Sequence, residues 1–316
     1  ALVTNMLSTI PENRHSDWFQ NADALFEKHR QLKLNNSFTE KPLRDKNRQA
    51  NRSKNKIPEK LMSQQQIQVK IAGITDTGLR RSANEDYIGF DQNLGIAVLA
   101  DGMGGHKAGG TASRMAVDSV LEALKMLINQ ETSGPVSSSQ LLAMVSNTIT
   151  DTNGKIYQTS SVNSDFKGMG ATVVAAVIKD TQLVVGHVGD SRAYLFRNRF
   201  LSRLTKDHSL LQELIDKGFY TELEARTATV GHVVTRALGT RAEVEVDAAR
   251  HELKQHDLVL LCSDGLTDMV SDSLIEVVLQ DCRDVESAAK ILVELANEHG
   301  GKDNISVILV QVQAGS

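Results

Sequence analysis

The sequence predicts an α+β fold built around antiparallel β-sheet, and three observations lead to this prediction. Short runs rich in valine and isoleucine have the length and composition of buried strands. Several runs are neighbours along the chain, as at residues 172–178, 183–188 and 194–196, which favours hairpins over the strand–helix alternation of a parallel sheet. Segments with helical periodicity occur between the other runs.

The expected elements follow one another from residue 67 onward. Strands are expected at residues 67–71, 96–100, 172–178, 183–188, 194–196, 258–262 and 305–310. Helices are expected at residues 111–129, 140–157 and 284–299. The last helix has Asp284 at its N-cap and two glycines just beyond its end, the usual asymmetry of helix termini.

Charge divides the chain into two parts. Residues 1–61 carry 12 Lys and Arg against 7 Asp and Glu, whereas residues 62–316 carry 23 against 32. We therefore predict an N-terminal extension at 1–61 and a separate domain at 62–316. Residues 17–34 have the spacing of a short amphipathic helix, and residues 35–60 have the composition of a basic linker. Two interpretations stay open: a flexible arm or added sequence, with Met62 as an alternative start, or a helix that docks on a partner.

Composition excludes several classes of protein. With 41% hydrophobic residues the chain is not predominantly disordered. Its sequence contains no apolar run long enough for a membrane span, and its opening residues do not resemble a secretory signal. Its two cysteines fit no zinc spacing, and we expect a cytoplasmic protein. A net charge of −4 and 4% aromatic residues give no indication of a nucleic-acid partner.

Aspartates stand where the apolar runs begin or end. They are Asp86, Asp101, Asp190, Asp264 and Asp303. One such residue is more often a turn or cap former, but several carboxylates brought together would repel one another unless a cation neutralised them. Oxygen ligands favour Mg²⁺ or Mn²⁺, and two such ions could activate water against a phosphoryl group. The planar fork of Arg81 could hold that phosphate.

Two other motifs indicate different chemistry and are set aside. The glycine-rich segment 101–110 has Lys107 where a dinucleotide fingerprint needs its third glycine, so we do not expect a nucleotide site. Residues 189–193 nearly match the nucleophile elbow of serine hydrolases, which would make Ser191 the nucleophile. However, an elbow leads into a helix, and residues 192–196 have the pattern of a returning strand.

Seven motifs in order resemble those of the metal-dependent protein phosphatases, the protein phosphatase 2C family, in their bacterial form. They are GLRRSANED at 78–86, ADGMGGH at 100–106, GAT at 170–172, GDSR at 189–192, LTKDHS at 204–209, SDGLTD at 263–268 and DNIS at 303–306. The resemblance implies a four-layer α-β-β-α sandwich with two central antiparallel sheets. It also implies a serine/threonine protein phosphatase with a binuclear Mn/Mg centre and a metal-bridging hydroxide.

The resemblance assigns roles to individual residues. The ligands of the two core ions would be Asp86, Asp101, the Gly102 carbonyl, Asp264 and Asp303, with Glu85 behind them and Asp190 and Asp268 for a third, weaker ion. Arg81 would bind phosphate. His106 corresponds to the general acid, although Met103-Gly104-Gly105 separates it from the Asp-Gly pair. We expect His208 to pack or cap instead.

The resemblance also implies partners. Phosphoprotein substrates of a serine/threonine kinase are expected, with the enzyme a monomer. The alternative is a non-catalytic relative that binds phosphoproteins, and loss of a ligand aspartate would favour it, but none is lost. Residues 209–233 would form a variable flap beside the site, with a capping box from Thr221 to Glu224 and a short helix.

Overall fold

The computed structural model describes residues 67–105, 107–130, 137–221, 224 and 233–314. The chain separates into two units, Ala1–Gln65 and Gln66–Ser316, and the described residues all belong to the second. The amphipathic helix at 17–34 and the basic linker at 35–60 lie outside the described residues. The domain boundary after residue 61 therefore stays a prediction.

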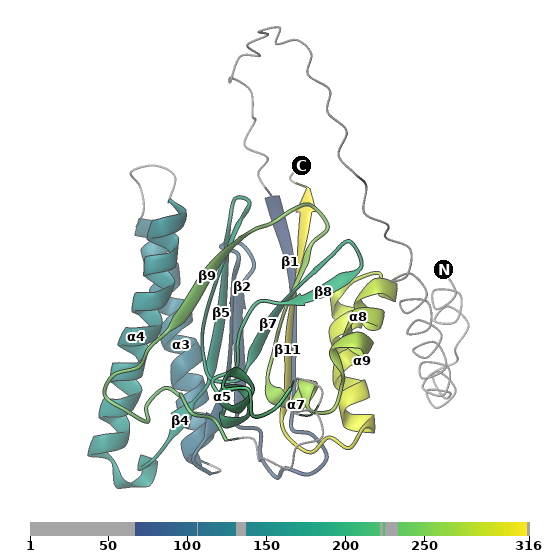
Figure 1. Cartoon of the computed structure of the whole chain (residues 1–316). Helices are drawn as coiled ribbons and strands as arrows, with labels where there is room; N and C mark the ends of the chain where they lie inside the picture. Colours follow the sequence, from purple (N-terminus) through teal and green to yellow (C-terminus); the bar gives the residue numbers. More distant parts are fainter. Residues whose placement is uncertain (1–66, 106, 131–136, 222–223, 225–232, 315–316) are drawn as a thin grey trace, which may run out of the picture. The chain divides into compact units, whose positions relative to one another are not determined.

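Two antiparallel sheets form the centre of the second unit (Figure 1). In the first sheet the strand order is β1 (Ile67–Asp76), β11 (Ile305–Ala314), β10 (Leu258–Cys262), β7 (Arg192–Arg197) and β8 (Phe200–Arg203). In the second it is β2 (Asp86–Asp91), β3 (Ile96–Met103), β5 (Val173–Lys179), β6 (Gln182–Val188) and β9 (Asp247–Glu252), and the short β4 (Gly170–Ala171) also pairs with β3.

Helices cover the outer face of each sheet. On the second sheet, α3 (Lys107–Gln130) contacts β2 and β3, and α4 (Ser138–Val162) contacts β6 and β9. On the first sheet, α8 (Asp272–Asp281) contacts β8, and α9 (Val285–Glu298) contacts β1 and β11. Short elements complete the chain: a 3₁₀ turn (Ser164–Phe166), α5 (Leu210–Asp216) and α7 (Asp264–Thr267). The predicted four-layer α-β-β-α arrangement is confirmed.

Strand β3 shows why the buried runs are continuously apolar. Ala97 and Leu99 face the other sheet, where they pack in one core with Leu261 and Ile308. The alternate residues of β3, such as Val98, face α3 and α4 in a second core. A strand that is buried on both faces has no polar side to alternate with, and this explains the apolar run at 96–100.

The ends of the helices follow local signals in the sequence. Ser137 and Gln140 form a capping box at the start of α4, and the Asp284 side chain accepts a hydrogen bond from Ser287 N at the start of α9. The elements that were not predicted from the sequence include β2, β8, β9 and α8. The strand β9, with sequence DAARHE, has no apolar alternation because it lies at the edge of its sheet and is largely exposed.

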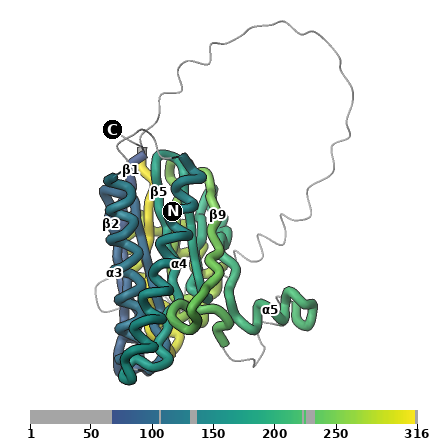
Figure 2. Tube along the Cα trace, turned by 90° about the vertical axis from the view of Figure 1, so that its left-hand side faces the viewer, coloured from purple at the N-terminus to yellow at the C-terminus, as the bar shows by residue number. Residues whose placement is uncertain are grey.

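The flap residues that the structure describes include α5, a helix of seven residues that stands away from the sandwich (Figure 2). Thr221 and Glu224 exchange hydrogen bonds in the predicted capping box, with Glu224 N donating to Thr221 Oγ1 at 3.2 Å. Residues 222–223 and 225–232 lie outside the described part. None of the helices that are described is both long and apolar enough to cross a membrane.

The strand directions place the five aspartates at one end of both sheets. Strands β3 and β10 run toward this end, and β2, β7 and β11 start from it. Asp86 begins β2, Asp101 is near the end of β3, and Asp264 follows β10. Asp190 precedes β7, and Asp303 precedes β11. Each of these five strands therefore has an aspartate at the same end of the sandwich.

Candidate active site

Asp86 and Asp101 lie opposite each other at the end of the ladder between β2 and β3. Asp86 is buried, and Asp101 is half-buried. The backbone N–H of Asp101 donates to Thr172 Oγ1 at 3.0 Å, and Thr172 Oγ1 in turn lies 2.7 Å from Ser191 Oγ. A chain of hydroxyl groups therefore connects the backbone of Asp101 with the turn that carries Asp190.

Asp264 and Asp303 come from the first sheet. Gly265 follows Asp264, and a Cβ atom at this position would overlap the carbonyl oxygen of Asn304. Only glycine therefore allows the turn after β10 to touch the start of β11, which brings Asp264 close to Asp303. Gly102 has the same function on the second sheet, because a Cβ there would overlap the carbonyl oxygen of Gly109 at the start of α3.

Ser263 joins the two sheets at the site. Its hydroxyl accepts a hydrogen bond from Ser306 N at 3.0 Å, which leaves its proton free to bond Asp86 Oδ2 at 2.8 Å. This hydrogen bond orients Asp86 through Oδ2, and the other carboxylate oxygen, Oδ1, takes no part in it. No function was expected for Ser263, Thr172 or Asn304 from the sequence, although each lies within one of the seven motifs and Ser263 and Asn304 adjoin an aspartate.

Three buried carboxylate oxygens in the described part of the chain have no hydrogen-bond partner at this site. They are Glu85 Oε1, Asp86 Oδ1 and Asp264 Oδ1. A buried carboxylate without a partner is costly, and a divalent cation with a preference for oxygen ligands would satisfy these atoms. The donor set therefore fits a hard cation such as Mn²⁺ or Mg²⁺.

The raised pKa values of the aspartates also favour a bound cation. Burial, followed by the charges of neighbouring aspartates, raises the pKa of Asp101 and Asp264 well above the ordinary value. Burial is also the main cause that raises the pKa of Asp86 to about 6 and that of Asp190 to about 6. Carboxylates that destabilise each other's ionised forms favour binding of protons or cations.

Arg81, Asp303 and Asp268 lie at the rim of the site. Arg81 Nη2 donates to Asp303 Oδ2 at 2.6 Å, and the side chains of both residues are partly exposed. Hydrogen bonding and the charge of Asp303 raise the pKa of Arg81, so it stays a cation. Asp268, which is exposed, adds to the raised pKa values of both Asp190 and Asp264 and therefore lies within their electrostatic reach.

Three other candidates from the sequence have different outcomes. His106 lies outside the described residues. Ser191 is buried and is followed directly by β7, so the helix that a nucleophile elbow requires is absent and the serine-hydrolase alternative is wrong. His208 packs as expected, since it is buried, stacks on His187 with ring centroids 4.7 Å apart, and accepts a hydrogen bond from Gly189 N.

A second group with ligand-type side chains consists of His187, His208 and Asp247. Arg236 occupies this group already, because its Nη1 lies 3.1 Å from His208 Nε2 and 2.9 Å from Asp247 Oδ1. A guanidinium in contact with two of three candidate ligands would repel a metal ion, and we assign the group a structural function.

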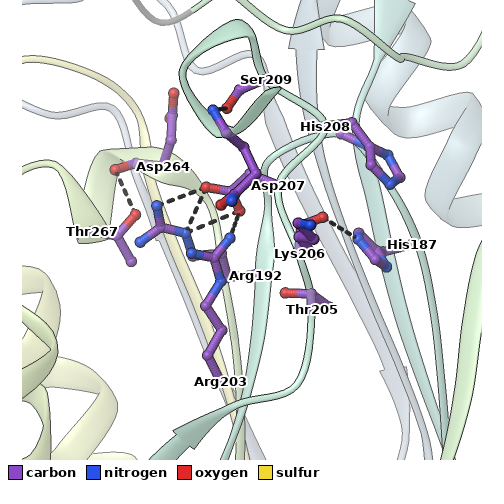
Figure 3. Close-up of polar contacts among 12 residues, drawn as sticks. His187, Arg192, Arg203, Thr205, Lys206, Asp207, His208, Ser209, Asp264 and Thr267 are labelled. Carbon is purple, nitrogen blue, oxygen red and sulfur yellow. Dashed lines mark hydrogen bonds and ion pairs between the residues drawn. The ribbon is translucent and has the colours of Figure 1, made fainter. Parts of the chain in front are cut away.

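Close to the aspartate cluster, Asp207 is neutralised by the protein's own cations (Figure 3). Arg192 donates three hydrogen bonds to its carboxylate, at 2.7 to 3.1 Å, and Arg203 donates another. The charge of Asp207 contributes to the raised pKa of Asp190. The same figure draws Asp264, whose carboxylate receives no such bond.

Comparison with known proteins assigns the family. A family model described as protein phosphatase 2C matches residues 80–302. The serine/threonine phosphatase stp of Listeria monocytogenes serotype 4b (strain F2365) is 40% identical over 240 residues, which cover 75% of this chain and 93% of that protein. The protein phosphatase PstP of Mycobacterium tuberculosis H37Rv is 38% identical over 251 residues, 79% of this chain and 46% of PstP.

Solved structures agree in fold. The crystal structure of M. tuberculosis PstP matches with a TM-score of 0.70 at 36% identity, covering 78% of this chain and 99% of that chain. The PstP catalytic domain in complex with two manganese ions matches with a TM-score of 0.68 at 37% identity and the same coverage. Fold and sequence together define a phosphatase of the bacterial metal-dependent type. The chain belongs to the protein phosphatase 2C family and is a phosphoprotein phosphatase.

Proposed function

We propose that this chain hydrolyses phosphoserine and phosphothreonine in proteins with the help of Mn²⁺ or Mg²⁺. The observation that carries the proposal is the set of buried carboxylate oxygens without partners at the meeting point of the two sheets. Relatives named serine/threonine phosphatases support the substrate class, and a relative with two manganese ions supports the metal. The substrates would be products of a serine/threonine kinase, and the enzyme a cytoplasmic monomer.

Asp86, Asp101, the Gly102 carbonyl, Asp264 and Asp303 would hold two ions, with Glu85 behind them. Asp190 and Asp268 would hold a third, weaker ion. Two ions held by these residues would activate a water molecule for attack on phosphorus and would stabilise the charge that develops on the leaving oxygen.

The protein groups would position the phosphate. Arg81 donates to Asp303 in the structure, and a bound phosphate would offer the guanidinium a second anionic partner with matching geometry. The partial exposure of the Arg81 side chain gives it room to reach a substrate at the rim.

Protonation of the leaving oxygen would fall to His106. A serine alkoxide is a poor leaving group until it is protonated, and an imidazole titrates near neutral pH. For His106→Ala we expect a larger loss of kcat on a phosphothreonine peptide than on p-nitrophenyl phosphate, whose phenolate leaves without help. Equal losses on the two substrates would exclude His106 as the acid.

One experiment tests the proposal as a whole. Initial rates are measured on p-nitrophenyl phosphate and on a phosphothreonine peptide, with Mn²⁺, with EDTA and with the Asp264→Asn variant. We expect activity that requires the divalent ion and collapses in the variant. Activity that persists under chelation and in the variant would contradict the proposal, and inactivity under every condition would favour a non-catalytic phosphoprotein-binding relative.

A further inference from the structure

Asn304 is a buried amide in which each polar atom is used, and its bonds all go to one loop. Asn304 is 5% exposed. Its Oδ1 accepts from Glu85 N at 2.8 Å, and its Nδ2 donates to the carbonyl oxygens of Thr77 at 2.9 Å and Ala83 at 3.0 Å. The three partners are backbone groups at both ends of the loop 77–85.

This loop carries Arg81 and contains no helix, and its residues before Asp86 belong to no strand. Its first half has further anchors, because Leu79 N and Arg80 N both donate to the carbonyl oxygen of Gly301, at 2.8 and 3.2 Å. Its second half, around Ala83 and Glu85, returns to the sheet next to Asp86. The Asn304 side chain bonds both halves of the loop, and together with the bond from Asn84 Nδ2 to Thr75 Oγ1 at 2.8 Å it holds the two ends of the loop near each other.

The residue type at 304 fits this task. An asparagine offers two N–H donors and one carbonyl acceptor, which is the set that two carbonyls and one N–H require. An aspartate would place acceptors against two carbonyl oxygens, and an alanine would leave three partly buried backbone groups without this partner. The backbone N–H of Asn304 also donates to Asp303 Oδ1 at 2.8 Å, and this bond does not depend on the side chain.

We propose that Asn304 is a positioning residue for Arg81. By holding the two ends of the loop 77–85 at a fixed separation, it presents the guanidinium at the rim of the aspartate cluster in the geometry that a phosphate needs. The inference rests on the proposed phosphate-binding function of Arg81. It predicts that loss of the Asn304 side chain weakens phosphate binding through Arg81 and through no other group.

A double-mutant cycle tests this directly. The inhibition constant of inorganic phosphate against p-nitrophenyl phosphate is measured at saturating Mn²⁺ for the full chain, Asn304→Ala, Arg81→Ala and the double variant. We expect Asn304→Ala alone to weaken inhibition about tenfold, since displacement of a positioned group by about 1 Å can cost on the order of a hundredfold. In the Arg81→Ala background the same substitution should change inhibition less than about twofold, because the groups that it positions are already lost.

Asn153 provides a matched control. It is 1% exposed, and its amide makes the same kinds of bonds to another loop, accepting from Gly239 N and donating to the carbonyl oxygens of Arg241 and Ala242. Asn153→Ala should lower the melting temperature as much as Asn304→Ala does and leave phosphate inhibition unchanged. If Asn304→Ala does not fold, Asn304→Ser, which cannot span the loop, takes its place in the cycle.

The outcomes separate the inference from the proposed function. Equal weakening of phosphate inhibition in both backgrounds, or no weakening in either, would overturn the inference while leaving the function intact. An Arg81→Ala variant with unchanged phosphate inhibition would show that Arg81 does not bind phosphate, and the inference would fall with that assignment. Calorimetry with Mn²⁺ completes the test, because Asn304→Ala should change Mn²⁺ affinity less than it changes phosphate affinity.

Discussion

Among the described residues, aspartates with buried carboxylate oxygens are of two kinds, which differ in what neutralises their charge. Asp257, 2% exposed, precedes β10 and accepts two hydrogen bonds from Arg197, at 2.6 and 2.9 Å, while Asp207 is bonded by Arg192 and Arg203. Asp264 follows the same strand at its other end, and Asp86 lies beside it. Each of these two keeps one buried oxygen without a partner in the described part of the chain.

Whether a buried carboxylate has an arginine partner separates structural aspartates from candidate metal ligands. When a buried carboxylate is bound to an arginine, the protein itself neutralises its charge, and the pair is a structural contact. A buried carboxylate with an unused oxygen is incomplete, and several of them facing one another require a cation from outside. One strand, β10, therefore has a structural aspartate before it and a candidate metal ligand after it.

The largest expected effect is on activity, which should depend on Asp264 and not on Asp257. Asp264→Asn should lower Mn²⁺-dependent turnover of p-nitrophenyl phosphate about a thousandfold, since a catalytic ion contributes several kcal/mol to transition-state stabilisation. Asp257→Asn, at the opposite end of β10, should retain turnover at a temperature where it is folded. A comparable loss of turnover in both variants would contradict the distinction.

The free energy of unfolding should change more in the Asp257→Asn variant than in the Asp264→Asn variant. Asp257→Asn should lower the free energy of unfolding by about 3 kcal/mol, because it leaves Arg197 without its buried partner. Asp264→Asn, measured in EDTA, should leave the stability unchanged or raise it, because it removes one of several repelling charges. Urea unfolding of both variants in EDTA checks this, and a large destabilisation by Asp264→Asn would show that this carboxylate has a structural partner.

The stability of the metal-free protein should depend on pH through the candidate metal ligands. An unfolded aspartate loses its proton near 3.8, whereas Asp86 and Asp190 in the folded protein lose theirs at about 6. Between these values the folded state binds more protons, so stability in EDTA should fall as the pH rises from 3.8 to about 6, by up to about 3 kcal/mol per carboxylate. Thermal unfolding across this range should show the fall, and saturating Mn²⁺ should remove it; a flat profile in EDTA would contradict it.

The smallest effect concerns the hydroxyl that orients Asp86. Ser263→Ala should weaken Mn²⁺ binding about ten- to hundredfold, since groups that orient a metal ligand contribute on that order. The control is Ser271→Ala, which removes the N-cap of α8 and should cost about 1 kcal/mol of stability with no change in Mn²⁺ affinity. Calorimetric titration with Mn²⁺ measures both, and equal affinities for the two variants would exclude an orienting function for Ser263.

The sequence contained most of the fold and the acidic half of the site. Strands buried on both faces, such as β3, appear as plain apolar runs, and the aspartates at their ends could be found by position alone. The strand β9 could not be found, because an exposed edge strand needs no apolar pattern. The contacts of Ser263 and Asn304 could not be predicted either, since each joins segments more than 170 residues apart in the sequence.

The aspartates reach the site from both sheets, Asp86 and Asp101 from one and Asp264 and Asp303 from the other. Cations shared between these residues would cross-link the two sheets, close to the first and last strands of the unit. Resistance of this enzyme to heat and to proteases would then vary with the concentration of free divalent ions, so that a cell short of manganese would lose the protein as well as its turnover.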